Sequence, residues 1–379
     1  MVDDERRNEV EDELRRQAKK SFDTGMTAFR RGDYSEALSA LDDALELCQD
    51  ISGSECGQAD CLHSSGIVLG EMGDLREALG CYEQALVLYR EVPGNECGQA
   101  NCLYNSGVAL GGLGDSRGAS ECYERALILF QGVPDSECVQ AECLFNRGAM
   151  LNELGDWWGA LGCFERSLTL FQGVPGSERE QADCLYGSGV SLSELGDCWG
   201  ALGYFDRALV LLDKGIVEVD WAEAERTGAR CLQGIGDCLV ELNEAVFPDH
   251  FARALEVFQR PEHVDHTKAD QASCLRSIGN GRSATDDLNG AVEAYQQAQD
   301  LYRQVGQPER ATEINVPLAR VLKRKAAAID SVFERLALLE ESLNLTVEAA
   351  LSLDRARFRL DRLDDRQRWF QAHARSTMD

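Results

Sequence analysis

Small and apolar residues recur along the chain at the spacing of one helical face. Between residues 62 and 69 they fall three or four apart, and the same spacing resumes between residues 78 and 86. A Gly73-Asp74 pair separates the two stretches. Asp74 followed by Glu77 is typical of a helix N-terminus, and Asp33 followed by Glu36 repeats it. Because the second stretch stops before Val92-Pro93-Gly94, the pattern predicts two helices joined by a tight turn.

This two-helix pattern recurs every 41 residues. Cys-Leu pairs begin at residues 61, 102, 143 and 184, and Gly-Asp pairs begin at residues 73, 114, 155 and 196. A fixed period of this length indicates a stacked array of repeats. A glycine such as Gly66 stands at one phase of each block, although glycine costs about 1 kcal/mol inside a helix. We therefore expect a neighbouring helix to pack too closely there for a Cβ atom.

The repeated positions resemble the signature of the tetratricopeptide repeat family. In the block that best shows the resemblance, they are Leu62, Gly66, Leu69, Gly73, Ala78, Tyr82 and Ala85. Weaker copies start at Gly236 and Gly279, so the resemblance covers about residues 14–305. It implies an all-α, right-handed superhelical solenoid of antiparallel helix pairs. The familiar repeat has about 34 residues, and similar lengthened repeats occur in kinesin light chain, Pins-type scaffolds and bacterial arrays that accompany caspase-like CHAT proteases.

Breaks in the repeat register suggest four parts. They are an acidic N-terminal segment (1–13), five regular repeats (14–212), two degenerate repeats with insertions (213–310) and C-terminal capping helices (311–379). The register break near Asp213 predicts a bend, a boundary between two sub-arrays, or ordinary decay of the repeat near the end of the array. Capping is expected of the last part because terminal repeats must present a polar outer face.

The charge is strongly negative and unevenly distributed. The 379 residues carry a formal net charge of -28. Residues 319–379 hold 12 Arg plus Lys and 10 Asp plus Glu, a net of +2, so the preceding residues carry -30. This acidity disfavours nucleic acid and anionic membranes as partners. Residues 1–12 lack the apolar core of a signal peptide, and there is no stretch of 18 apolar residues, so we expect a cytoplasmic protein.

The chain offers few residues for catalysis, and we expect neither an enzyme nor a bound cofactor or metal. A G-x-S-x-G string at 114–118 falls on a turn between predicted helices, whereas a nucleophile elbow follows a strand. The cluster at 262–266, with two His, one Glu and one Asp, predicts a solvated loop rather than a metal site. Ten of the fifteen Cys fall at three repeat phases: Cys56, Cys97 and Cys138; Cys61, Cys102, Cys143 and Cys184; Cys81, Cys122 and Cys163. Such copying predicts small buried packing residues rather than disulfides or zinc ligands.

The resemblance also implies a binding surface, because the first helices of this family line a concave groove that receives a segment of a partner. The groove positions form four rows: Asp60, Asn101, Glu142 and Asp183; His63, Tyr104, Phe145 and Tyr186; Ser64, Asn105, Asn146 and Gly187; Ile67, Val108, Ala149 and Val190. Glu71, Glu153 and Glu194 extend the acidic edge. Family members that clamp the acidic C-terminus of chaperones use Lys, Arg and Asn there, and this chain has the opposite charge.

Aromatic residues flanked by carboxylates suit a partner segment with apolar anchors and Lys or Arg. Asn105 and Asn146 would then hydrogen-bond its backbone. The alternative is that acidic rows only keep a long array soluble. Trp158 and Trp199 share one phase in adjacent repeats, where they either form a second contact surface or pack on each other and on the next repeat.

Two functions follow from this interpretation. The first is a non-enzymatic interaction scaffold that binds a basic or apolar segment of another protein. The second is a regulatory subunit, sensing or inhibitory, of a separate effector enzyme such as a caspase-like CHAT protease. Self-association is compatible with either.

Overall fold

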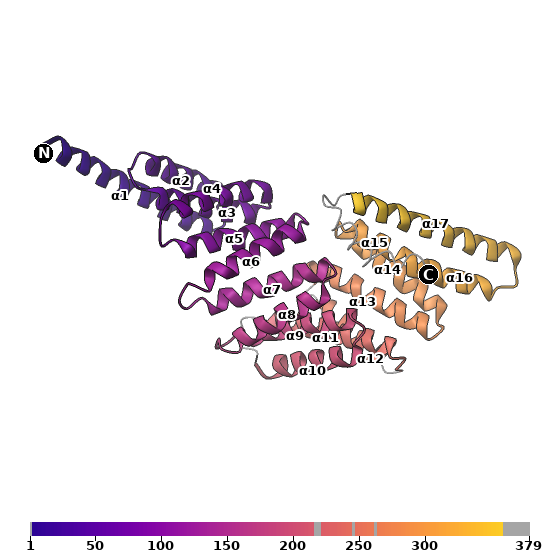
Figure 1. Ribbon diagram of the computed structural model, residues 1–379. Helices are drawn as coiled ribbons and strands as arrows, with labels where there is room; N and C mark the ends of the chain where they lie inside the picture. Colours follow the sequence, from indigo (N-terminus) through magenta and orange to yellow (C-terminus); the bar gives the residue numbers. More distant parts are fainter. Residues whose placement is uncertain (1, 216–220, 245–246, 261–263, 359–379) are drawn as a thin grey trace. The chain divides into compact units, whose positions relative to one another are not determined.

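The computed structural model describes residues 2–215, 221–244, 247–260 and 264–358 (Figure 1). Within these ranges all regular secondary structure is α-helical, which confirms the all-α repeat class. The chain divides into two compact units, Met1–Glu153 and Leu154–Asp379, hereafter unit 1 and unit 2. None of the helices in the described ranges combines the length and apolarity that a bilayer span needs.

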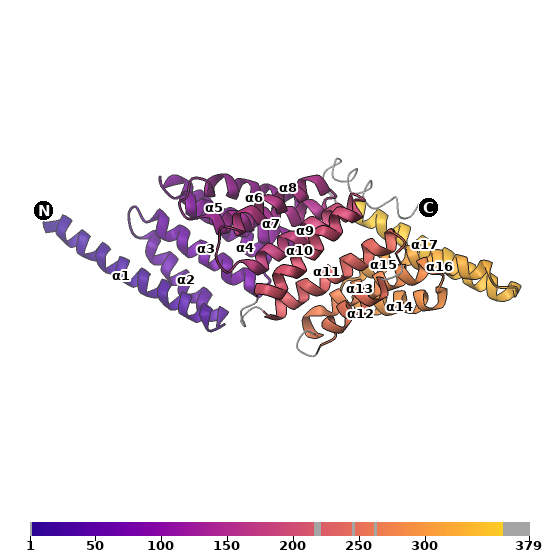
Figure 2. The ribbon, with the colours of Figure 1, turned by 90° about the horizontal axis from the view of Figure 1, so that it is seen from below.

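Unit 1 is a stack of antiparallel helix pairs. Its helices are α1 (Val2–Arg30), α2 (Tyr34–Gln49), α3 (Glu55–Met72), α4 (Leu75–Glu91), α5 (Glu96–Gly112), α6 (Ser116–Phe130) and α7 (Glu137–Glu153). The two views in Figures 1 and 2 show α1 beside α2, α3 beside α4 and α5 beside α6. Residues 2–13, expected as a separate acidic segment, are the first part of α1.

Unit 2 begins with the second helix of a repeat and continues with further pairs. Its helices are α8 (Trp157–Phe171), α9 (Glu178–Glu194), α10 (Cys198–Gly215), α11 (Trp221–Glu241), α12 (Phe247–Phe258), α13 (Val264–Ala284), α14 (Leu288–Gln304), α15 (Pro308–Glu313), α16 (Asn315–Ala327) and α17 (Val332–Phe358). Three segments lie outside the described residues: 216–220 of the register break, 261–263, which include the first two residues of the His-containing cluster, and 359–379 of the expected cap.

The turn inside each repeat follows from its Gly-Asp pair. Gly73 and Gly114 end helices with φ of +87° and +81°, in the left-handed region that favours glycine. The following aspartate precedes the second helix, and the Asp33 carboxylate accepts from the backbone N–H of Glu36 at 3.2 Å, as predicted. Asp74 occupies the same N-cap position without a side-chain hydrogen bond.

The repeated glycine inside the first helix makes room for an aromatic ring. A Cβ atom added to Gly66 would lie 2.5 Å from Cε1 of Tyr82, and one added to Gly107 would lie 2.7 Å from Cε1 of Tyr123. In unit 2 the equivalent pairs are Gly189 with Phe205, Gly236 with Phe251 and Gly279 with Tyr295. The expectation that a neighbouring helix leaves no room for Cβ is therefore confirmed.

Cysteines fill a second repeated core position. Cys61, Cys102, Cys143 and Cys184 are buried, and the same phase continues at Cys231 and Cys274. The packing interpretation is wrong for Cys97 and Cys138. Each is the second residue of its helix and is exposed, because the first turn of that helix projects beyond the core.

The last helix does not present the polar outer face expected of a cap. α17 packs on α16 through Leu338, Ser342 and Leu345. Its opposite side exposes Phe333 (87%), Leu336, Leu339, Leu343, Val347 and Leu351. Apolar residues occupy two faces of this helix, and α16 covers one of them.

Candidate functional site

Several first helices of neighbouring repeats touch one another within each unit. In unit 1, α1 contacts α3 and α3 contacts α5, whereas α2, α4 and α6 make no comparable contact among themselves. In unit 2, α9 contacts α11 and α11 contacts α13. Helices on the inside of a curved stack lie closest together, so we call the exposed side of the first helices the inner face of each unit.

The aromatic row lies on the inner face of unit 1, half-buried. The His63 and Tyr82 ring centroids are 5.8 Å apart, and those of Tyr104 and Tyr123 are also 5.8 Å apart. Phe145 is half-buried at the next position along the row. Because the rings of His63 and Tyr104 rest on the aromatic residue that fills the glycine slot of the same repeat, the row is partly an extension of the core.

The two predicted backbone-binding asparagines are tied to this aromatic row. Asn105 donates from Nδ2 to Nε2 of His63 at 2.9 Å, and Asn146 donates from Nδ2 to the Tyr104 hydroxyl at 3.3 Å. Each asparagine thus reaches back to the preceding repeat. An amide has two N–H groups and a carbonyl, so each asparagine retains hydrogen-bonding capacity beyond this contact. Burial raises the pKa of Tyr104 to about 12, with a further contribution from Glu142.

Carboxylates dominate the part of the inner face of unit 1 that α3, α5 and α7 form. α3 and α5 contain no Lys or Arg. The one basic residue of α7, Arg147, pairs with Glu124 at 3.0 Å. Asp60 is exposed and accepts a hydrogen bond from the Tyr89 hydroxyl, while Asn101 and Glu142 continue its row half-buried. This surface therefore carries net negative charge.

Apolar atoms lie beside these carboxylates. Val108 is 49% exposed and Ile67 is half-buried, so both contribute to the inner face. Ser64, which the sequence places in the same set, is only 6% exposed and lies beneath the surface.

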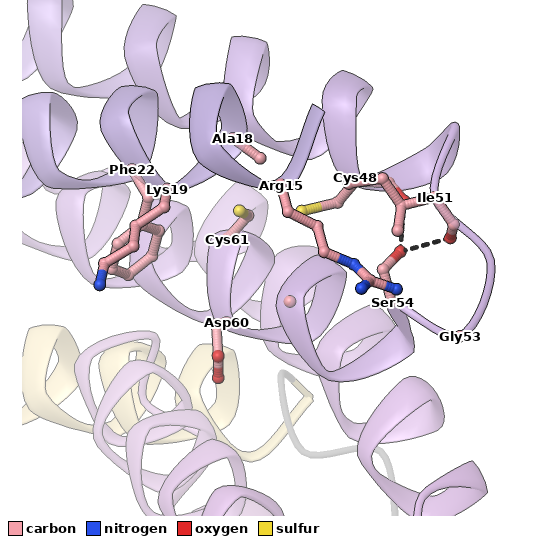
Figure 3. A pocket seen from close by; sticks show the side chains of 11 residues that line it. Arg15, Ala18, Lys19, Phe22, Cys48, Ile51, Gly53, Ser54, Asp60 and Cys61 are labelled. Carbon is pink, nitrogen blue, oxygen red and sulfur yellow. Dashed lines mark hydrogen bonds between the residues drawn. The ribbon is translucent and has the colours of Figure 1, made fainter. Parts of the chain in front are cut away.

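A cavity of about 370 Å³ opens at the first repeat of unit 1 (Figure 3). Ala18 and Phe22 of α1, Ile51 of the α2–α3 turn, and the thiols of Cys48 and Cys61 form its apolar walls. Arg15, Lys19 and Asp60 add charged groups. Sequence reasoning did not identify this cavity.

In unit 2, the predicted groove residues of α9 join a polar network. Asp183 accepts from Thr227 Oγ1 at 2.6 Å and from Arg179 Nη1 at 3.4 Å, and its burial raises its pKa. The Tyr186 ring lies 6.0 Å from that of Phe205 and is half-buried. Glu194 is exposed at the C-terminal end of α9.

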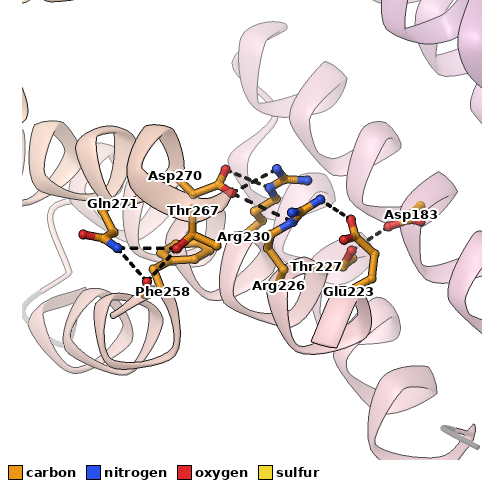
Figure 4. A network of polar contacts seen from close by, with 9 residues as sticks. All are labelled: Asp183, Glu223, Arg226, Thr227, Arg230, Phe258, Thr267, Asp270 and Gln271. Atoms are coloured by element: carbon orange, nitrogen blue, oxygen red, sulfur yellow. Dashed lines mark hydrogen bonds and ion pairs between the residues drawn. The ribbon is translucent and has the colours of Figure 1, made fainter. Parts of the chain in front are cut away.

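Arginines reverse the charge pattern further along unit 2 (Figure 4). Arg230 of α11 binds Asp270 of α13 with two hydrogen bonds, Nε to Oδ1 at 3.0 Å and Nη2 to Oδ2 at 3.1 Å. Arg226 pairs with Glu223 one turn away. Asp237 accepts from Ser277 at 3.0 Å, and burial raises its pKa to about 6.

Arg230 stands where the regular repeats carry Asp183 and Glu142, so the acidic row ends at this residue. The repeated cysteines align these positions in the sequence, because Asp183, Arg230 and Ser273 each directly precede one of them. The steps from Cys184 to Cys231 and Cys274 are 47 and 43 residues, so a strict 41-residue period does not reach them.

Comparison with known proteins identifies the repeats. The tetratricopeptide repeat family matches residues 24–91, 62–131 and 140–214. These residues are tetratricopeptide repeats. No curated protein matches the sequence significantly.

Solved structures resemble the tetratricopeptide array well beyond the matched residues. The apo quorum sensor NprR from B. thuringiensis has a TM-score of 0.61 at 14% identity, covering 93% of this chain and 94% of that one. The apo form of RapI gives 0.60 at 16% identity, covering 76% and 99%. A Rap protein complexed with Competence and Sporulation Factor gives 0.57 at 14% identity, covering 95% and 97%. At these identities the likeness shows the fold alone.

Two tryptophans lie on the outside of the tetratricopeptide array. Trp158 of α8 is 70% exposed and Trp199 of α10 is 68% exposed. Such exposure is incompatible with burial against the next repeat. It leaves two large apolar side chains on second helices of unit 2.

The residues considered for catalysis or metal binding make contacts that belong to the helical fold. In the G-x-S-x-G string, Asp115 caps α6, and Ser116 begins that helix and donates to Glu153 at 2.5 Å. Over the described part of the chain, the His, Cys, Asp and Glu side chains do not gather in groups of three that could hold a metal ion.

Proposed function

We propose that the protein is a non-enzymatic scaffold whose inner face binds a segment of another protein, with unit 1 selecting a basic segment that has apolar anchors. The observation that carries this proposal is the pairing of half-exposed rings and Val108 with carboxylates on α3, α5 and α7. Lys and Arg are absent from α3 and α5. A solubility role would explain the charge, but it gives no reason for exposed apolar side chains among the carboxylates.

The electrostatic half of this proposal is confined to unit 1. In unit 2, Arg226 and Arg230 compensate Glu223 and Asp270, so a basic segment would gain less there. Complementary charge chiefly increases the rate of encounter and the selectivity of an interface. We therefore expect affinity for a basic segment to fall as salt is added.

A peptide-display selection on the intact chain tests the proposal. Peptides of random sequence should be enriched for Lys or Arg together with aromatic or aliphatic residues. They should lose at least tenfold in affinity for a Glu71→Lys/Glu142→Lys variant, which reverses charge on the inner face. The control, Glu83→Lys, reverses charge on the second helix α4 and should bind as the parent does. Enrichment of acidic peptides, or equal affinity for all three proteins, would refute the proposal.

Trp158 and Trp199 would supply a second contact surface. Their exposed indoles resemble the anchors that dominate protein interfaces. Arg stands at this phase in earlier repeats, at Arg76 and Arg117, so Trp158→Arg/Trp199→Arg should fold normally. Loss of captured proteins by this variant, with unchanged binding of the selected peptides, would separate the two surfaces. Unchanged capture would count against the second one.

Regulation of a separate effector enzyme, such as a caspase-like protease, is the second candidate function. The exposed apolar side of α17 favours it, because this helix follows the repeats and differs from them. The similar fold of a quorum sensor and of a factor-bound Rap protein fits such a role. Co-purification of a catalytic protein that is lost on Leu336→Glu/Leu343→Glu substitution would support it, and co-purification unaffected by the change would not.

A further inference from the structure

Near its C-terminal end, the second helix of each repeat buries a side chain four residues after its last small position. In six repeats this side chain is large: Tyr89, Phe130, Phe171, Leu212, Phe258 and Tyr302, each at most 7% exposed. In the first repeat the same position, four residues after Ala44, is Cys48. The first repeat therefore lacks the bulk that the others bury.

The backbone at this position is held alike in different repeats. In the first, Ser54 donates to the carbonyls of Cys48 and Ile51, and Gln58 donates to Cys48 at 3.4 Å. In the third, Ser136 donates to Phe130 at 2.7 Å and to Val133 at 2.6 Å, and Gln140 donates to Phe130 at 3.3 Å. Ser177 and Gln181 repeat the arrangement on Phe171. The difference at Cys48 thus lies in the side chain and not in the position of the chain.

The cavity of about 370 Å³ lies where that ring is missing (Figure 3). Gly57 lines it, and an added Cβ there would lie 3.2 Å from the Cys48 sulfur. One repeat later, a Cβ added to Gly98 would lie 2.8 Å from the Tyr89 ring. The cavity is therefore an unfilled version of the slot that holds Tyr89.

The polar edge of the slot differs between these repeats, because the cavity has two cations beside Asp60. The Tyr89 hydroxyl points to Asp60. The residue 41 positions before Asp60 is Lys19, which lines the cavity together with Arg15. Figure 3 shows Arg15 and Lys19 reaching from α1 over the cavity. A ring placed in this cavity as Tyr89 is placed in the next repeat would have its outermost atoms beside Arg15 and Lys19.

We propose that the Cys48 cavity binds an aromatic side chain of a partner protein that has a carboxylate beside the ring. The apolar walls would contact the partner's ring as the equivalent walls of later repeats contact Tyr89 and Phe130. Arg15 and Lys19 would supply positive charge for the carboxylate. This preference is opposite to that of the carboxylate-rich surface on α3, α5 and α7, with which the cavity shares Asp60 at its edge. It does not rest on the proposed function.

Fluorine NMR of 4-fluorophenylacetate with the intact chain tests the site. The resonance should broaden saturably with the parent protein. Cys48→Phe should weaken binding at least tenfold and should raise Tm, because its ring fills the slot as Phe130 does. Cys97→Phe, which adds a ring at an exposed position, should change neither. No saturable broadening with the parent, undiminished binding to Cys48→Phe, or a lowered Tm would overturn the proposal.

The same fluorine NMR measurement tests the role of the two cations and whether a protein segment can supply the ring. We expect 4-fluorobenzylamine to bind at least tenfold more weakly than the acid, and Lys19→Glu to remove that preference. A capped Asp-Phe-Asp peptide should displace the acid, whereas Asp-Ala-Asp should not. Equal binding of acid and amine would refute the role of the cations, and failure of Asp-Phe-Asp to compete would refute a protein segment as the occupant. Since Glu71 and Glu142 do not line the cavity, failure here leaves the inner-face proposal testable.

Discussion

The side-chain amide of Asn105 in α5 donates a hydrogen bond of 2.9 Å to Nε2 of His63 in α3. An amide nitrogen only donates, so this contact favours the neutral imidazole, whose Nε2 can accept. Burial lowers the pKa of His63, and this effect exceeds the opposing effect of Asp60. The folded state therefore disfavours the charged ring.

Acidification should destabilise the protein through His63. At a pH above 6.5, the ordinary pKa, the ring is neutral in both folded and unfolded chains and adds no pH dependence. Below it, the unfolded chain takes up the proton first, so the Tm should fall as pH decreases from 7.5 to 5.5. His63→Phe keeps an aromatic ring in the row and should lose less over the same interval. Equal losses in the two proteins, measured by circular dichroism, would contradict this account.

Two glycines inside helices, one that faces an aromatic ring and one that faces open space, should respond in opposite ways to substitution by alanine. Gly66→Ala places a Cβ 2.5 Å from the Tyr82 ring, so we expect a loss of about 2 kcal/mol in the free energy of unfolding. Gly80→Ala, in α4, meets no atom within 4 Å, and its better helix propensity should stabilise by about 0.5–1 kcal/mol. Urea denaturation gives both values. A stable Gly66→Ala protein would show that Tyr82 moves aside at little cost.

The sequence predicted the features that depend on spacing within one repeat. Helix pairs, turn glycines and the slot at Gly66 follow from local periodicity and from the cost of glycine in a helix. The contact between Asn105 and His63 spans 42 residues and depends on how one repeat stacks on the next, which periodicity does not specify. The exposure of Cys97 depends on how far a first turn projects beyond the core. Cys48 could have been recognised, because aromatic residues stand at its phase in the next three repeats.

Arg230 and Asp270 should stabilise unit 2 as a pair. Their paired side chains are 32% and 17% exposed and share two hydrogen bonds, so loss of one partner leaves a poorly solvated charge. We expect Arg230→Ala to cost about 2 kcal/mol. Arg230→Lys should recover only part of this, since an ammonium group cannot bind both carboxylate oxygens in the same way. A double-mutant cycle with Asp270→Ala should give a coupling energy of at least about 1 kcal/mol. A coupling near zero would mean that the arginine is available for a ligand instead.

Alkylation with iodoacetamide should divide the cysteines according to burial and not according to any catalytic activation. The thiolate is the reactive form, and burial raises the pKa of Cys102, Cys143, Cys184 and Cys274 to about 12. Cys97 and Cys138 are exposed on first turns, so they should be modified within minutes at pH 8 in the native protein. The buried row should react only after urea unfolds the chain, as peptide mass spectrometry would show. If one member of that row instead reacts in the native protein as fast as Cys97, its thiol must be activated by its surroundings. The packing role would then be wrong for that residue.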